Sequence, residues 1–113
     1  MKTYTGGCHC GAVAYEVETD LKDTITCNCS HCEKKGFILN FVDAVKFRLL
    51  KGKENLETYQ FNKKHIDHHF CKTCGTQSFG ESSAYGKVAV NVRCLDGVDI
   101  STLSPKHVDG KGA

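Results

Sequence analysis

The sequence lacks any long apolar run. No stretch approaches the ~20 consecutive apolar residues of a transmembrane helix, so we expect no membrane partner. The start of the chain, Met-Lys-Thr-Tyr-Thr-Gly-Gly, also lacks the apolar core of a secretory signal peptide. We therefore expect the protein to be cytoplasmic.

The sequence also has little excess charge. Fifteen Lys and Arg residues against thirteen Asp and Glu residues give a formal net charge of +2. The lysines are scattered, apart from the pairs Lys34 with Lys35 and Lys63 with Lys64, so no basic stripe is present that could follow a phosphate backbone. We expect no nucleic-acid partner.

Internal repeats, low-complexity stretches and domain linkers are absent from the sequence as well. With 113 residues, 40% of them hydrophobic, the chain is long enough to bury a core. We expect one domain over residues 1–113, small enough for a bound metal to matter for its stability. The oligomeric state does not follow from the sequence.

Cysteine is what the sequence has in excess, with eight in 113 residues. Seven of the eight fall into three tight groups, which are Cys8 and Cys10, then Cys27, Cys29 and Cys32, then Cys71 and Cys74. In a reducing cytosol, clustered cysteines more often bind metal or serve catalysis than form disulfides. We therefore interpret the three groups as metal ligands.

Short segments of alternating apolar and polar residues, rich in β-branched and aromatic types, predict strands. These segments cover residues 12–18, 24–26, 37–42, 45–50, 56–61, 76–79 and 88–94. One helical turn is expected over residues 33–36, ending at glycine, and a short helix over 99–103 before Pro105. Because the strands are many and short and helical periodicity is weak, we predict a mostly β fold of two small packed sheets.

The first and last cysteine groups together predict a structural zinc site. Zinc in structural sites prefers four ligands in a tetrahedron, and the two groups supply four sulfurs from distant parts of the chain, those of Cys8, Cys10, Cys71 and Cys74. Structural zinc contributes on the order of 10 to 16 kcal/mol in small peptides, so losing one ligand is expected to unfold much of the domain.

The middle group, with the spacing C-x-C-x-x-C, predicts a second and different site. Side chains two residues apart on a strand share a face, so Cys27 and Cys29 can converge while a turn brings Cys32 back. Three thiolates leave one open position on a tetrahedral zinc, as in a reactive metal site. Alternatively a fourth side chain closes the site and the protein is a binding module; the candidates are Cys94, His31, His65, His68 and His69.

The donor set of the middle group favours chemistry at sulfur. A zinc ion held by three thiolates is a weaker Lewis acid than one held by three histidines, and it is less suited to making hydroxide. It suits a bound thiol, because a metal lowers the thiol pKa from its usual ~8.5 and keeps the sulfur nucleophilic at neutral pH.

In order and spacing, these motifs resemble the glutathione-dependent formaldehyde-activating enzyme family, which also includes the centromere protein V type domain. The matching segments are residues 6–13, 27–32, 56–61, 70–75 and 91–97. The resemblance implies a β-tent (Mss4-like) fold, with a structural zinc on Cys8, Cys10, Cys71 and Cys74 and a second zinc on Cys27, Cys29 and Cys32. It also implies a carbon–sulfur lyase that joins glutathione, a small thiol partner, to formaldehyde as S-(hydroxymethyl)glutathione.

Two further residues are candidates for roles beside the second site. The Arg93 guanidinium is able to bind a carboxylate of a thiol substrate through two parallel hydrogen bonds, or it is an ordinary surface arginine. Cys94 is expected to be a packed strand cysteine rather than a ligand, since free cysteine is among the most buried residue types. The alternatives to the enzyme are a zinc-stabilised module that binds a protein or chromatin, and a reductase with Cys94 as nucleophile, the latter from the fold's similarity to methionine sulfoxide reductase B.

Overall fold

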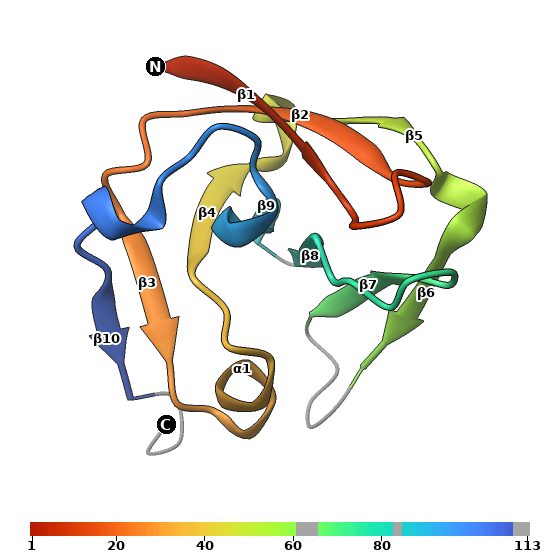
Figure 1. Cartoon of the computed structure of the whole chain (residues 1–113). Coiled ribbons are helices and arrows are strands. Elements are labelled where there is room, and N and C mark those ends of the chain that lie inside the picture. The colour runs from red at the N-terminus through yellow and green to blue at the C-terminus, as the bar shows by residue number, and fades with distance from the viewer. Residues whose placement is uncertain (61–65, 83–84, 110–113) are drawn as a thin grey trace.

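The computed structural model describes residues 1–60, 66–82 and 85–109, and within these ranges the chain is mostly β, as the sequence predicts (Figure 1). Its strands form two sheets, one of three strands and one of seven. Residue 61, the end of one predicted strand, and His65, one of the candidate ligands, lie outside the described residues.

The smaller sheet has the strand order β1-β2-β5, is antiparallel throughout, and lies across the top of the view in Figure 1. Its strands are β1 (Lys2–Gly7), β2 (Ala14–Thr19) and β5 (Phe47–Lys51). The sequence predicts β2 and β5 but not β1, whose side chains are mostly exposed and which ends in two glycines. The pairing of β1 with β2 along its whole length holds the chain in place just before Cys8.

The larger sheet has the strand order β10-β3-β4-β9-β8-β7-β6, and among these described strands only the pair β10 and β3 is parallel. In Figure 1 its two ends lie on opposite sides of the molecule, with α1 (Ser30–Lys35) near the lower end between them. The strands are β3 (Thr24–Cys27), β4 (Leu39–Asp43), β6 (Leu56–Tyr59), β7 (Asp67–Cys71), β8 (Phe79–Ser82), β9 (Lys87–Asn91) and β10 (Lys106–Val108).

The hydrophobic core lies between the two sheets. Val88 and Val90 of β9 belong to the same buried cluster as Tyr15 and Val17 of β2. Because successive side chains on a strand point to opposite faces, Ala89, between the two valines, lies on the other face of the larger sheet. The larger sheet thus has one face in the core and a second face that is left for the site.

Two strands have other bounds than predicted, one displaced along the chain and one shorter. The strand predicted over 76–79 begins only at Phe79, and the strand predicted over 88–94 ends at Asn91. The Asn91 side-chain oxygen accepts a hydrogen bond from the Arg93 backbone N–H at 3.2 Å, as asparagine does where it begins a turn. The four 3₁₀ turns within the described residues are η1 (Ala44–Lys46), η2 (Lys53–Asn55), η3 (Val92–Cys94) and η4 (Ile100–Thr102), and η4 confirms the short helix predicted before Pro105.

The helix α1 begins earlier than the turn predicted at 33–36. Its N-cap is Cys29, whose sulfur accepts a hydrogen bond from the Cys32 backbone N–H at 3.3 Å. It ends at Gly36, as predicted, where φ is +68° and the glycine N–H donates to the Cys32 carbonyl oxygen at 2.9 Å. Both ends of this short helix are therefore tied to cysteines of the middle group.

None of the helices in the described parts of the chain combines the length and the apolar character needed to cross a bilayer.

Gly52 supports the loop that carries the first cysteine pair, and this gives a test of the fold. A Cβ atom there would lie 2.2 Å from the Ala12 carbonyl oxygen, and φ is +93°. We expect Gly52→Ala to lower the free energy of unfolding by more than about 3 kcal/mol. The control is Gly97→Ala, where φ is +72° but no atom lies within 4 Å, so about 1 kcal/mol is expected from the backbone conformation alone. Urea denaturation measures both, and equal losses would contradict the close approach.

Candidate metal centres and the pockets beside them

The sulfurs of the first and the last cysteine group in the sequence lie together. The Sγ atoms of Cys8, Cys10, Cys71 and Cys74 all lie within 4.8 Å of one another. The distance from Cys10 Sγ is 3.6 Å both to Cys8 Sγ and to Cys71 Sγ. Zinc–sulfur bonds of about 2.3 Å in a regular tetrahedron place the sulfurs about 3.8 Å apart, so this group has the dimensions of a zinc site. The cysteines that the spacing pairs are thus brought together in the structure.

Hydrogen-bond donors surround the four sulfurs. The Val13 backbone N–H donates to Cys8 Sγ at 3.3 Å, and the Asn55 side-chain amide donates to Cys71 Sγ at 3.2 Å. The Thr76 hydroxyl and backbone N–H lower the pKa of Cys74 to about 5. Such donors favour thiolates, and thiolates are the form that binds metal. The Ala12 backbone N–H acts in this direction on Cys10 as well, but burial and the three neighbouring sulfurs outweigh it and raise the pKa of Cys10 to about 11, so all four sulfurs ionise together only around a cation. The four-cysteine group therefore fits a bound cation.

The three cysteines of the middle group converge as well. The Sγ atoms of Cys27, Cys29 and Cys32 lie within 4.8 Å of one another, where β3 passes into α1. The Cys29 N–H donates to Cys27 Sγ at 3.4 Å, and the Cys32 N–H donates to Cys29 Sγ at 3.3 Å. Burial opposes ionisation of Cys29, but the Cys32 and His31 N–H groups outweigh it and lower its pKa.

Burial and the two neighbouring sulfurs act in the opposite direction on Cys32 and raise its pKa. Three sulfurs this close repel one another as thiolates, so all three ionise together only around a cation. Together with the N–H groups aimed at Cys27 and Cys29, this donor set fits a metal ion held by three thiolates.

Cys94 belongs to neither group of converging sulfurs. Its thiol donates to the Gln77 carbonyl oxygen at 3.9 Å. Burial raises its pKa, and the nearby sulfurs of Cys8 and Cys74 act in the same direction, so the thiol is protonated at neutral pH. A protonated, packed thiol agrees with the expectation that Cys94 is not a ligand, and it lends no support to Cys94 as a reductase nucleophile.

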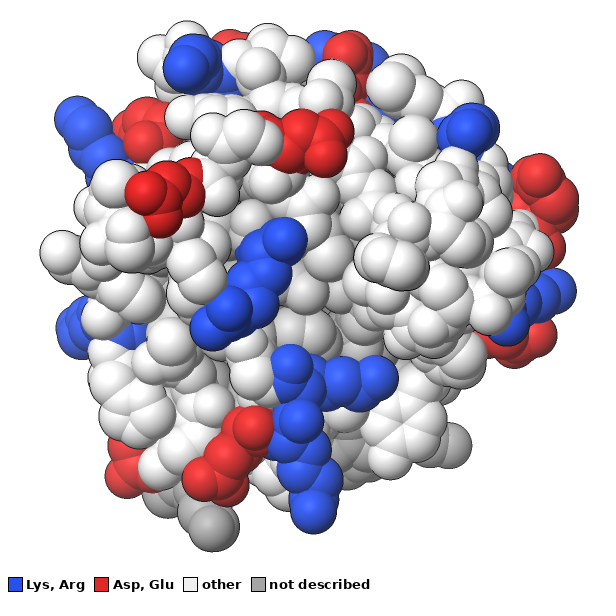
Figure 2. Space-filling model, viewed as in Figure 1, with Lys and Arg blue, Asp and Glu red and all other residues white. Residues whose placement is uncertain are grey.

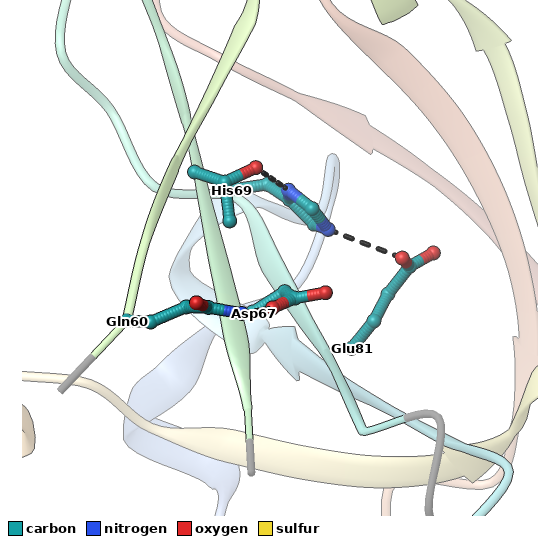
Figure 3. Close-up of polar contacts among 5 residues, drawn as sticks. Gln60, Asp67, His69 and Glu81 are labelled. Atoms are coloured by element: carbon teal, nitrogen blue, oxygen red, sulfur yellow. Dashed lines mark hydrogen bonds and ion pairs between the residues drawn. The ribbon is translucent and has the colours of Figure 1, made fainter. Parts of the chain in front are cut away.

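His69, another candidate ligand, is held by other partners (Figure 3). Its Nδ1 lies 3.0 Å from Thr58 Oγ1 and its Nε2 lies 3.1 Å from Glu81 Oε2, so both ring nitrogens are engaged. Gln60 and Asp67 form a separate hydrogen bond nearby. The side chain of His69 also packs against Phe79 at a centroid distance of 5.2 Å, on the face of the sheet that is directed to the core.

The two remaining described candidate ligands, His31 and His68, form a pair of tilted rings next to the middle group. The ring centroids of His31 and His68 lie 4.0 Å apart, and His31 also stacks on Tyr59 at 5.7 Å. Nδ1 of His68 lies 3.1 Å from the Gln77 side-chain nitrogen, and both residues are buried. Burial lowers the pKa of His68 to about 4, with His31 and His69 adding to the effect, so its ring is neutral at pH 7.

On one side of this pair lies a basic pocket of about 440 Å³. Lys34 and Lys35 line it together with His31 and Tyr59, and no acidic side chain is among its described lining residues. Figure 2 shows Lys and Arg side chains gathered on this face, around the position of α1. The pocket offers positive charge within a few residues of Cys32.

On the other side lies an apolar cavity of about 250 Å³, whose walls include all three cysteines of the middle group. Leu39, Phe41 and Ala89 contribute to its apolar wall. Gln77 lines both the basic pocket and the apolar cavity, while His31 lines the first and His68 the second. The paired histidines and Gln77 therefore form the partition between a basic pocket and an apolar cavity.

Arg93 lies beside the end of α1, where its Nε donates to the Gly36 carbonyl oxygen at 3.0 Å. It is exposed and is not among the residues that line the basic pocket or the apolar cavity. The structure thus places Arg93 beside the C-terminal end of α1, the end that also carries Lys35, and outside both compartments.

Comparison with known proteins decides the family. The family model of the glutathione-dependent formaldehyde-activating enzyme matches residues 3–108. The chain belongs to this family. The crystal structure of a protein from Rhodobacter sphaeroides is similar to it, with a TM-score of 0.84 and 34% sequence identity over 92% of this chain and 99% of that chain. The family match and the mostly β architecture together confirm the β-tent fold that the resemblance implies.

Several residues of this family member beside the cysteines were not singled out from the sequence. Asn55, Tyr59 and Gln77 come to the two cysteine groups only through the pairing of strands that are distant in the chain. The pair Lys34 and Lys35 was noticed, but only as a break in an otherwise even charge distribution. The signal that could have identified this pair is its short distance in sequence from Cys32, since both lysines lie in the last turn of the helix that Cys29 caps.

Removing one cysteine is expected to unfold the protein in the four-cysteine group but not in the middle group. Cys74→Ser should bind one zinc fewer and lose most of its folded structure, because the group joins distant parts of the chain. Cys32→Ser should also lose one zinc but remain folded. Cys94→Ser is the control and should keep both ions. Elemental analysis and circular dichroism measure these outcomes, and loss of zinc from the control variant would show that Cys94 is a ligand.

Asn55 is expected to raise the metal affinity of the four-cysteine site without being a ligand. Asn55→Ala removes the amide that donates to Cys71 Sγ, and loss of such an outer contact typically weakens metal affinity about 10- to 100-fold. Competition with a chromophoric chelator measures the affinity. Gln60→Ala, which removes an exposed side-chain amide whose partner is Asp67, serves as the control and should leave the affinity unchanged. An unaltered affinity for Asn55→Ala would contradict a supporting role.

Proposed function

We propose that this chain is a zinc-dependent enzyme that joins a small thiol, glutathione, to an aldehyde, in the manner of S-(hydroxymethyl)glutathione formation from formaldehyde. In this reaction a bond forms between sulfur and the carbonyl carbon, and the C=O π bond breaks. The thiol proton ends on the former carbonyl oxygen. The reverse reaction, cleavage of the carbon–sulfur bond, gives the class of carbon–sulfur lyase.

The observation that carries the proposal is the position of the middle cysteine group, which borders the apolar cavity and starts the helix that lines the basic pocket. Cys27, Cys29 and Cys32 would hold the zinc, and a zinc on three thiolates would keep an incoming thiol ionised at neutral pH. No other side chain of the described residues belongs to this group of donors, which supports an open site rather than a closed binding module.

The basic pocket supports a charged thiol as the substrate. Glutathione carries two carboxylates, and Lys34 and Lys35 supply positive charge in the basic pocket, on the same helix as Cys32. A carboxylate that extends past the end of α1 would meet Arg93, whose terminal nitrogens are able to form two parallel hydrogen bonds with it while Nε binds the Gly36 oxygen. This is the role we propose for Arg93.

The partition residues supply polar groups next to the reacting atoms. His68 is neutral at pH 7, because burial lowers its pKa to about 4, so its ring adds no charge beside the thiolates. Gln77 orients that ring through the 3.1 Å contact with Nδ1. We propose that these two side chains position the carbonyl group of the aldehyde against the thiol sulfur, and that the cavity keeps bulk water away from the adduct.

The direct test follows the rate at which glutathione and formaldehyde reach equilibrium with their adduct. Exchange NMR measures this rate with the zinc-loaded protein and in its absence, because the reaction also proceeds without a catalyst. We expect an increase that disappears in Cys32→Ser, which removes one sulfur of the middle group. A rate equal to the background for this pair and for other thiols and aldehydes would refute the proposed function.

Charge in the basic pocket should act on thiol binding rather than on the chemical step. Replacing Lys34 and Lys35 together by alanine should raise KM for glutathione about 5- to 20-fold, as expected for two partly exposed ion pairs, and leave kcat nearly unchanged. The difference should shrink in 0.5 M salt because of screening. Lys51→Ala, on β5 of the smaller sheet, removes an exposed lysine elsewhere and is the control. An unchanged KM in the double variant would place the carboxylates of the thiol outside this pocket.

A further inference from the structure

We propose that the aldehyde accepted by this chain carries an apolar substituent of about six carbons, and that this substituent binds in the cavity of about 250 Å³ beside Cys27, Cys29 and Cys32. This inference rests on the proposed function and goes beyond it by naming the class of aldehyde. Formaldehyde, with one carbon, would fill only a small part of the cavity.

The cavity is built on the face of the larger sheet that is turned away from the core. Cross-strand pairing places Phe41 of β4 opposite Ala89 of β9, Ala89 opposite Gly80 of β8, and Gly80 opposite His68 of β7. All four residues line the cavity, so they form one continuous row across four strands. Because side chains alternate along each strand, the residues next to them in sequence, such as Val42, Val88 and Val90, fill the core instead.

Room exists in the middle of this row because its two central residues are small. Ala89 has a single methyl group and Gly80 has no side chain. The space at Gly80 is narrow, because a Cβ atom there would lie 3.2 Å from the Asp67 carbonyl oxygen. Larger residues at these two positions would fill the space. For comparison, an engineered apolar cavity of about 150 Å³ binds benzene, so a volume of about 250 Å³ is sufficient for a substituent of at least that size.

The lining decides what kind of group binds there. None of the described residues that line the cavity is Asp, Glu, Lys or Arg. Its polar side chains include Asn91, which donates to the Gln77 carbonyl oxygen at 3.0 Å, and Gln77, which is in contact with His68. Water in such a cavity finds few partners, and a charged tripeptide would lose its hydration there without compensation. A hydrocarbon group is the occupant that this lining favours.

The two compartments therefore divide the substrates between them. The thiol, with its carboxylates, belongs on the side of Lys34 and Lys35, and the aldehyde substituent belongs on the apolar side of the partition. The sulfur group of the thiol and the carbonyl carbon then meet at the three cysteines, which border the cavity. The product is a hemithioacetal, formed by addition of S–H across C=O, with no oxidant or reductant required.

A binding experiment tests the cavity without turnover. Straight-chain primary alcohols from methanol to 1-octanol are unreactive analogues of the aldehydes, and NMR titration of the zinc-loaded protein measures their affinities. We expect the affinity to rise about fourfold for each added methylene, up to about six carbons. Ala89→Leu, which fills the centre of the cavity, should abolish this rise. Ala44→Leu makes the same change at an exposed position on η1 and should preserve it.

A second variant keeps the test decisive if Ala89→Leu does not fold. Phe41 lines the cavity and is 44% exposed, so Phe41→Ala should enlarge the cavity at little risk to the core and should extend the rise in affinity to longer alcohols. An affinity that does not depend on chain length, or a rise that neither Ala89→Leu nor Phe41→Ala alters, would overturn the assignment of the cavity.

Turnover measurements separate this inference from the proposed function. With glutathione as the thiol, the protein should accelerate the reaction of hexanal over its own background more than that of formaldehyde. Ala89→Leu should remove this advantage of hexanal, and the exposed control Ala44→Leu should keep it. Acceleration of formaldehyde with none for hexanal would overturn the inference and leave the proposed function standing. Alcohol binding in the cavity with no acceleration for any aldehyde would overturn the proposed function, and the aldehyde class with it.

Discussion

Mutual repulsion among closely packed sulfurs is the constraint on which the rest of this structure depends. Four sulfurs at one point and three at another all lie within 4.8 Å of their neighbours, and thiolates at that distance need a cation between them. Backbone and side-chain N–H groups reduce the repulsion but are too few to remove it. The four-sulfur group lies where the loop after β1 meets the turn after β7, so a cation held there to relieve the charge would also join the smaller sheet to the larger one.

Alternation along the strands of the larger sheet separates stability from function. On β4 and β9 the residues that build the core, such as Val42 and Val90, alternate with residues that line the apolar cavity, such as Phe41 and Ala89. The core can therefore be well packed while the opposite face keeps an open volume next to the three cysteines. His31 and His68 then divide this face from the basic pocket at α1. Strong core packing and a large cavity coexist because they use different faces of the same strands.

Cysteine spacing carried most of what the sequence could predict. Spacing alone identified the two groups that the structure brings together, and alternation located most strands and the mostly β class. The turn at Val92–Cys94 was missed because a hydrogen bond from Arg93 to the Asn91 side chain ends an otherwise regular strand pattern. The cavity was missed for a different reason. Phe41, Ala89 and Gly80 form a row only through strand register, which one-dimensional patterns do not specify.

The parallel pairing of β10 with β3 bears on how the protein is made. It sets Val108 beside Cys27, and the hydrogen bond between Thr26 and His107 joins residues 81 positions apart in the chain. Contacts of such high contact order form late, since the residues from β3 to β10 must all be synthesised before β3 gains this neighbour. During synthesis the thiols of the middle group are therefore exposed to oxidants and competing ions for longer than a locally folded cysteine motif would be. A metal ion bound by this group would therefore gain its final protein surroundings only after β10 has paired with β3.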